Sequence, residues 1–289
     1  MRIKFIGKKN NKNIGQKLKG NKEKAMIKLV AVDMDGTFLN GQKEYNKKRF
    51  MAIYETMKER DIKFVVASGN QYYQLKSFFS EIASEISFVA ENGALIISEN
   101  EELFCGEMTE VLVDKMLNFF EKDPKIQTIM CGRKSAYTSQ KETSTFIEGG
   151  RKYYHKLEVV DKLSSEIDDI IFKFALNVPR EETENYMEMF NTQFQNEVVA
   201  VSSGNGAIDL IIPGLHKANG LQLLQDRWQI EAEHMATFGD GGNDLEMLKH
   251  AKHSYAMKNA SKKVKEVANF EAPSNEDEGV LVVLEELIK

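Results

Sequence analysis

The apolar residues of this chain gather in short runs that alternate with stretches of helical spacing. Residues 28–32 form an unbroken, β-branched-rich run, which predicts a strand buried on both faces. Residues 47–60 carry apolar side chains at helical spacing and predict a helix covering that strand. A strand at 63–67, a helix at 71–79 and a strand at 87–90 continue the alternation. This order predicts parallel strands joined by right-handed crossovers.

The pattern changes character in the middle of the chain and then returns. The middle predicts a hairpin at 94–97 and 103–105, helices at 109–122 and 181–194, and strands at 126–130, 170–177 and 198–201. Between the strands at 126–130 and 170–177 we expect only a polar stretch. The later part predicts strands at 207–212, 234–238 and 254–257, a helix after Lys217, and helices at 245–249, 261–267 and 280–288.

We therefore expect an α/β fold, with a doubly wound, mostly parallel, Rossmann-like sheet interrupted by an inserted α+β domain. The predicted division is a basic extension at 1–25, a core domain at 26–107 and 209–289, and the inserted domain at 108–208. With 289 residues the chain is long enough for two domains of ordinary size.

Composition and charge narrow the class of protein. The chain is 42% hydrophobic and 29% charged, and it has neither an apolar run of about 20 residues nor the apolar core of a secretory signal. We expect a cytoplasmic protein that does not enter membranes. Residues 1–25 carry a net charge of +8, which leaves −13 for the rest of a chain whose total is −5. The acidic body argues against nucleic-acid binding, although binding through residues 1–25 stays an alternative.

Two carboxylates directly follow the first predicted strand. Asp33 and Asp35 stand at its carboxyl end, where open α/β sheets bind ligands, and Gly36 and Thr37 allow a tight turn that offers N–H groups to an anion. A calcium-binding EF-hand is the first alternative, but Phe38 occupies the position where that loop needs glycine, and a strand precedes it. A surface turn with two incidental acids is the second alternative.

Polar residues also follow the ends of three other predicted strands. Ser68 and Gly69 follow the second strand, and Lys217 follows the strand at 207–212. The sequence Gly239-Asp240-Gly241-Gly242-Asn243-Asp244 follows the strand at 234–238. Several carboxylates at one edge of a sheet favour Mg²⁺, and a helix N-terminus next to Ser68 and Gly69 favours a phosphate. So much negative charge in one place needs a cation.

At these residues the chain resembles the haloacid dehalogenase superfamily, and within it the Cof-type phosphatases with a large α/β cap of type IIB. Asp-Met-Asp-Gly-Thr at 33–37, Ala-Ser-Gly-Asn at 67–70, Lys217 and the segment 239–244 match the four motifs in order. Glu-Asn-Gly-Ala at 91–94 and Met-Lys-Asn-Ala at 257–260 extend the resemblance over residues 26–289. Most relatives have Thr and Arg in the second motif, and the Ser-Gly-Asn version is similar to a sugar-phosphatase branch.

The resemblance implies the role of each motif residue. It implies catalysis by Asp33 as nucleophile and Asp35 as general acid and base, assisted by Lys217. The implied phosphate-binding residues are Gly36, Thr37, Ser68, Gly69 and Asn243. The implied Mg²⁺ ligands are Asp33, the backbone carbonyl of Asp35, and Asp240, with Asp244 supporting them by hydrogen bonds.

We therefore predict a Mg²⁺-dependent phosphatase that hydrolyses small phosphomonoesters, sugar phosphates above all, through an aspartyl-phosphate. The expected partner is a small phosphorylated metabolite, with no nucleic acid and no membrane, and the expected state is a monomer or weak homo-oligomer. A sugar phosphomutase and a phosphate-accepting regulatory protein with little turnover are the alternatives. Asp35 argues against the regulatory protein, because a mere phosphate acceptor does not need a second acid.

Overall fold

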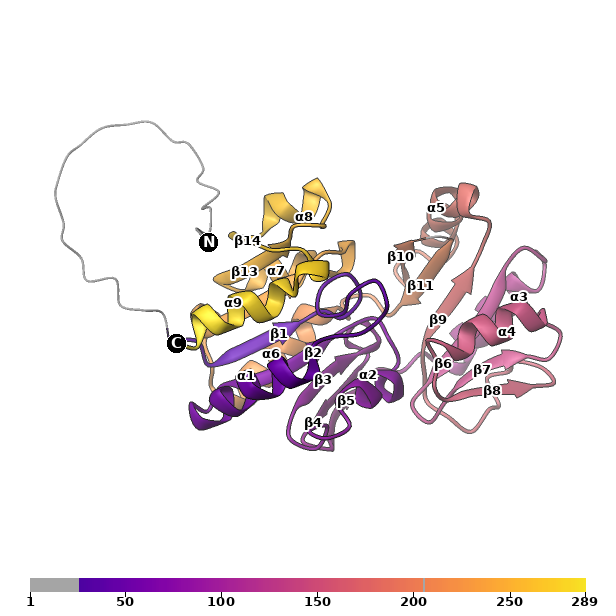
Figure 1. Ribbon diagram of the computed structural model, residues 1–289. Coiled ribbons are helices and arrows are strands. Elements are labelled where there is room, and N and C mark those ends of the chain that lie inside the picture. Colours follow the sequence, from indigo (N-terminus) through magenta and orange to yellow (C-terminus); the bar gives the residue numbers. More distant parts are fainter. Residues whose placement is uncertain (1–25, 205) are drawn as a thin grey trace. The chain divides into compact units, whose positions relative to one another are not determined.

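The computed structural model describes residues 26–204 and 206–289 (Figure 1). These residues form two compact units, one made by the chain up to Phe64 together with Gln225–Lys289, the other by Val65–Leu224. The basic segment 1–25, on which the nucleic-acid alternative depends, lies outside the described residues. The predicted division into a core at 26–107 and 209–289 and an insertion at 108–208 stays a prediction. No helix in the described part of the chain is long and apolar enough to cross a bilayer.

The first unit is a parallel sheet with helices. Its strands are β1 (Leu29–Val32), β12 (Met235–Gly239), β13 (His253–Met257), β14 (Phe270–Ala272) and the start of β2 (Lys63–Ala67). Its helices are α1 (Lys47–Glu59), α7 (Leu245–His250), α8 (Lys262–Val267) and α9 (Gly279–Leu287), with short 3-10 turns η3 (Ala232–His234), η4 (Gly242–Asp244) and η5 (Asn275–Asp277). Strands β14, β13, β12 and β1 pair side by side and parallel, as the alternation of strands and helices predicts.

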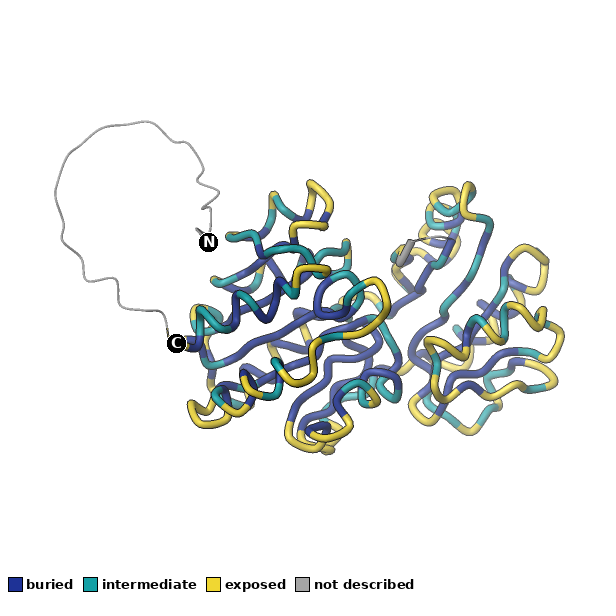
Figure 2. Tube along the Cα trace, viewed as in Figure 1, coloured by how far each residue is buried: buried dark blue, intermediate teal, exposed yellow. Residues whose placement is uncertain are grey.

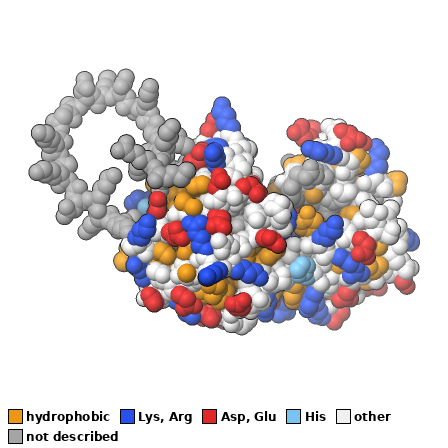
Figure 3. All heavy atoms as spheres, in the orientation of Figure 1, with side chains coloured by type: hydrophobic (Ala, Val, Ile, Leu, Met, Phe, Trp, Pro, Cys, Tyr) orange, Lys and Arg blue, Asp and Glu red, His pale blue; other side chains and the backbone are white. Residues whose placement is uncertain are grey.

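Burial explains why these segments form strands and helices. All four residues of β1 are buried, which fits a strand covered on both faces (Figure 2). In α1 the buried side chains recur at helical spacing, and Asn46 caps the helix by accepting a hydrogen bond from the backbone N–H of Arg49. Arg49 in turn donates to the carboxylates of Glu278 and Glu285, which ties α1 to α9. Over the visible surface of this unit, side chains of both charges are interspersed (Figure 3).

The second unit begins with the rest of β2 and contains a second sheet, which has six strands. Its first elements are α2 (Tyr72–Phe78), β3 (Ser87–Ala90), the 3-10 turn η1 (Glu91–Gly93), β4 (Leu95–Ser98) and β5 (Glu101–Cys105). Next come α3 (Glu110–Phe120), β6 (Gln127–Gly132), β7 (Ala136–Ser139), α4 (Ser144–Arg151), β8 (Leu157–Val160), β9 (Ile171–Asn177), η2 (Arg180–Glu182), α5 (Thr183–Gln193), β10 (Val199–Gly204) and β11 (Ala207–Ile211). Helix α6 (Lys217–Trp228) runs on into the first unit.

The six-stranded sheet of this unit has the order β10-β11-β9-β6-β7-β8 and is mostly antiparallel. Buried residues of α3 and α5 pack against one face of it and include aromatic side chains such as Phe120 and Phe190, which lie in contact with each other. Within the same unit β2 and β3 pair parallel, and β3, β4 and β5 pair antiparallel, as the predicted hairpin requires. The predicted α/β class with a mostly parallel sheet and an α+β module is thus confirmed.

One expectation about the fold is wrong. The segment between the strands β6 and β9, which we expect to be a polar stretch, contains β7, α4 and β8. These elements are short, and α4 contains two glycines, which lower its intrinsic helix propensity. They form because β7 pairs with both β6 and β8, and because Thr143 caps α4. Pairing across the sheet overrides a weak local pattern.

Candidate active site

The register of β1 and β12 brings two distant carboxylates to the same edge of the sheet. Val32 pairs with Phe238 in parallel, so Asp33 and Asp240 both follow at the carboxyl ends of neighbouring strands. The backbone N–H of Asp33 donates to the carbonyl of Phe238 at 3.0 Å and extends the pairing by one step. Two residues about 200 positions apart in the sequence therefore lie side by side because their strands are neighbours.

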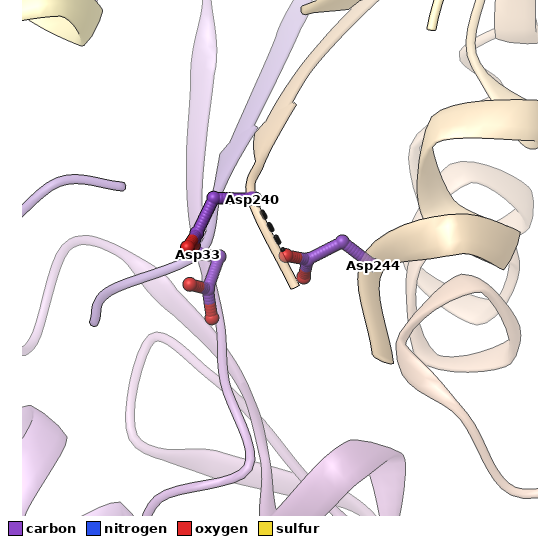
Figure 4. Close-up of side chains that lie close together, drawn as sticks. All are labelled: Asp33, Asp240 and Asp244. Atoms are coloured by element: carbon purple, nitrogen blue, oxygen red, sulfur yellow. Dashed lines mark hydrogen bonds between the residues drawn. The ribbon is translucent and has the colours of Figure 1, made fainter. Parts of the chain in front are cut away.

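Three carboxylates meet at this edge. Asp33, Asp240 and Asp244 each offer an oxygen, and these oxygens all lie within 4.8 Å of one another (Figure 4). Asp33 is 6% exposed and Asp244 is fully buried. Carboxylates this close repel one another, and buried carboxylates need a compensating charge. Hard carboxylate oxygens are the ligands that Mg²⁺ prefers, so the donor set fits a divalent cation.

Asp244 also organises the loop that carries Asp240. Its Oδ2 accepts hydrogen bonds from the backbone N–H groups of Asp240 at 2.9 Å and Gly241 at 2.8 Å. Gly239 packs so closely here that a Cβ at that position would lie 2.5 Å from the Cβ of Asp244. Asn243 is half-buried in the same turn, η4. The carboxylate of Asp244 therefore fixes the backbone that positions Asp240.

The turn after Asp35 is shaped around Asp240. The hydroxyl of Thr37 donates to Asp240 Oδ1 at 2.8 Å. Gly36 has a φ of +77°, and a Cβ there would lie 2.5 Å from Asp240 Oδ2. Only glycine fits both requirements without strain. The side-chain amide of Asn259 donates to the carbonyl of Gly36 at 2.7 Å and holds the turn from outside.

Asp35 has different surroundings from those of Asp33. Its carboxylate lies 2.6 Å from the ammonium nitrogen of Lys43, and about one third of the Asp35 side chain is exposed. Lys43 has a φ of 62° in the turn that follows. Sequence reasoning does not find Lys43, because a lysine in a polar turn carries no distinguishing signal.

The remaining predicted residues lie in the second unit. Ser68 directly follows β2 and is 2% exposed, and its backbone N–H donates to the carbonyl of Val89 at 2.9 Å. Gly69 comes next, and a Cβ there would lie 3.0 Å from the side-chain oxygen of Asn92. Lys217 is fully buried at the start of α6. The structure thus brings Asp33 together with Asp240 and Asp244. That Ser68 and Lys217 belong to the same site stays a prediction.

Sequence reasoning also misses a buried lysine in this unit. Lys173 interrupts the apolar strand β9 and is 1% exposed. A lysine inside an otherwise apolar strand is the signal that could have found it, because lysine is almost never fully buried unless it is paired. Its partners are Glu91 and Asp209. From the sequence alone, Glu91 is placed in the motif at 91–94 and Asp209 in the strand at 207–212, and neither residue is given a role.

Comparison with known proteins identifies the family. The haloacid dehalogenase-like hydrolase family matches residues 30–284. The chain belongs to this family. The hydrolase is 49% identical over 263 residues to the 5-amino-6-(5-phospho-D-ribitylamino)uracil phosphatase of Escherichia coli (strain K12), covering 91% of this chain and 97% of that protein. It is 25% identical over 266 residues to phosphoglycolate phosphatase 1 of Saccharolobus solfataricus, covering 91% and 97%.

Solved structures agree with this assignment. A crystal structure from Streptococcus mutans UA159 matches the hydrolase with a TM-score of 0.85 and 40% identity, over 90% of this chain and 98% of that chain. A second match, from Thermotoga maritima, has a TM-score of 0.78 at 23% identity and shows the same fold. The predicted superfamily and the prediction of an enzyme of the phosphoric monoester hydrolase type are confirmed.

Proposed function

We propose that this hydrolase is a Mg²⁺-dependent phosphatase that cleaves small phosphomonoesters of sugars or sugar alcohols through an aspartyl-phosphate on Asp33. The observation that carries the proposal is the group of carboxylates at the ends of β1 and β12, with Asp33 beside Asp240 and Asp244. The named substrate of the Escherichia coli relative, a phosphate ester of a ribityl chain, supports the substrate class.

The chemistry assigns a role to each acid. A carboxylate oxygen of Asp33 attacks phosphorus, and the bond from phosphorus to the alcohol oxygen breaks. Asp35 gives its proton to that departing oxygen. Asp35 then takes a proton from a water molecule as the water attacks the aspartyl-phosphate, which releases inorganic phosphate and restores Asp33.

The carboxylates of Asp33 and Asp240 and the backbone carbonyl of Asp35 would hold Mg²⁺, which when bound neutralises negative charge on the phosphoryl group. Asp244 keeps the Asp240 loop in place through its two backbone hydrogen bonds. The groups proposed to hold phosphate oxygens are the side chains of Ser68, Asn243 and Lys217 and the loop amides of Gly36, Thr37 and Gly69.

A substrate panel tests the proposal. Purified protein with Mg²⁺ is assayed for release of inorganic phosphate from sugar phosphates, sugar-alcohol phosphates that include the substrate of the Escherichia coli relative, and nucleotides. We expect release from the first two groups, silence in excess chelator, and recovery when Mg²⁺ is restored. Undiminished activity in chelator would refute the metal requirement, and transfer of phosphate within the sugar without release would favour a phosphomutase.

Two variants test the assigned acids. Asp33→Asn should abolish both turnover and the acyl phosphate that hydroxylamine traps in the wild type. Asp35→Asn should abolish turnover and leave substrate binding, because it removes the proton donor and keeps the shape. Asp61→Asn is the matched control, since Asp61 is an aspartate of the same unit with a side chain 89% exposed. Near-normal turnover in Asp35→Asn would dismiss its role.

We also propose that the protein is cytoplasmic, and that it is a monomer or a weak homo-oligomer.

A further inference from the structure

The second unit buries an ion cluster that the proposed chemistry does not use. The ammonium of Lys173 in β9 lies 2.5 Å from Glu91 Oε2 and 3.6 Å from Asp209 Oδ2. The side-chain amide of Asn92 donates to the same Asp209 oxygen at 2.9 Å. Lys173, Glu91 and Asp209, called the Lys173 cluster below, are respectively 1%, 2% and 9% exposed.

Stability alone does not account for this cluster. Burial would lower the pKa of Lys173, but the carboxylates of Asp209 and Glu91 outweigh it and hold that pKa above its usual range. Burial raises the pKa of Glu91 and of Asp209, and Lys173 opposes both shifts. Taking three charged groups out of water is costly, and well-packed apolar residues often serve stability as well or better. A buried lysine in an apolar strand therefore needs another explanation.

Lys173 and the turn η1 donate hydrogen bonds to three consecutive backbone carbonyl groups, those of residues 68–70. The carbonyl of Ser68 accepts from the backbone N–H of Asn92 at 3.0 Å. The carbonyl of Gly69 accepts from the ammonium of Lys173 at 2.9 Å. The carbonyl of Asn70 accepts from the backbone N–H of Glu91 at 3.2 Å. The loop at 68–70, which the second motif occupies, is thus anchored at every carbonyl.

The contact with Lys173 orients a particular peptide group. In a trans peptide the C=O and the following N–H point in opposite directions, so fixing the carbonyl of Gly69 also fixes the N–H of Asn70. That N–H donates to the hydroxyl oxygen of Ser68 at 3.2 Å. A hydroxyl that accepts one hydrogen bond can still donate its proton to another oxygen. The Gly69–Asn70 peptide thereby connects the Lys173 ammonium with the Ser68 hydroxyl.

We propose that Lys173 is a positioning residue for phosphate binding, which turns the Gly69–Asn70 peptide so that the Ser68 hydroxyl is held ready to donate to a phosphate oxygen. The inference rests on the proposed phosphate-binding role of Ser68. Under this proposal, β9 of the six-stranded sheet helps to fix the conformation of the second motif at 67–70.

Binding of inorganic phosphate, measured by isothermal titration calorimetry with Mg²⁺ present, tests the proposal without needing turnover. Lys173→Met keeps the length of the side chain and removes its donors, and we expect a dissociation constant for phosphate about tenfold higher, as for the loss of a group that orients a ligand. In a Ser68→Ala background the same change should add nothing, because both act through one hydroxyl. Asp209→Asn is the matched control: it removes charge from the cluster, keeps the contact between Lys173 and Gly69, and should stay within about twofold of wild type.

The stability of each variant is measured separately by urea unfolding. If Lys173→Met does not fold because Glu91 is left buried without its partner, the double variant Lys173→Met/Glu91→Gln replaces it. Independent, additive effects of Ser68→Ala and Lys173→Met would overturn the proposal. So would equal losses of phosphate affinity in Lys173→Met and Asp209→Asn, which would reduce the cluster to a structural role. A wild type that binds phosphate but releases none from any ester would overturn the proposed function alone, and a wild type that binds no phosphate would overturn both.

Discussion

Replacing Asp240 with Asn is expected to stabilise the hydrolase in the absence of Mg²⁺. The change removes one of three carboxylates whose oxygens lie within 4.8 Å of one another. Two unit charges at that distance repel by about 3 kcal/mol at an effective dielectric constant of about 20. Solvent reaches the half-buried Asp240 and screens part of this repulsion. We therefore expect the free energy of unfolding in chelator to rise by about 2 kcal/mol.

The same variant should lose its response to Mg²⁺. A ligand that binds only the folded state stabilises it by about 2.7 kcal/mol at a concentration 100 times its dissociation constant. Wild type should gain stability of this order from Mg²⁺, whereas Asp240→Asn, with one charged ligand fewer, should gain little. The two proteins would then exchange their order of stability when chelator is replaced by Mg²⁺.

Urea unfolding followed by circular dichroism, in excess chelator and in saturating Mg²⁺, measures both effects. Asp61→Asn removes an aspartate charge from the same unit at an exposed position, so it should differ little from wild type in either condition. The reasoning is refuted if Asp240→Asn is less stable than wild type in chelator, or if Mg²⁺ stabilises both proteins equally.

Two further substitutions and one labelling experiment test other parts of the structure. Arg49→Met should lower the unfolding free energy by about 1 kcal/mol near neutral pH. Arg49 holds the pKa of Glu278 and of Glu285 below the usual value of about 4.5. The stability difference between wild type and Arg49→Met should therefore shrink as pH falls below that value, which urea titrations at several pH values can show. Gly36→Ala should cost about 1 to 3 kcal/mol of strain and most Mg²⁺-dependent activity, measured as phosphate release. Burial raises the pKa of the Cys131 thiol, so iodoacetamide should alkylate it only after unfolding, as mass spectrometry can detect.

Much of the fold was predictable because its signals are local. The run at 28–32 and the helical spacing at 47–60 show their burial in the residue pattern itself, and β1 and α1 appear there. β7, α4 and β8 were not predictable, because strand pairing rather than local pattern selects them. β14 was not predictable either, because three residues carry too little periodicity to identify a strand.

The sequence by itself determined which chemistry this protein can carry. Motif order and spacing placed Asp33, Asp240 and Asp244 at the ends of strands, because the end of a buried strand is marked in the sequence by a change from apolar to polar residues. Only the tertiary structure decided that β1 pairs with β12, which brings these oxygens within 4.8 Å of one another. Only it showed Lys173 on the carbonyl of Gly69, about 100 residues away. Contacts between distant segments depend on strand neighbours and register, which no local pattern of side chains records.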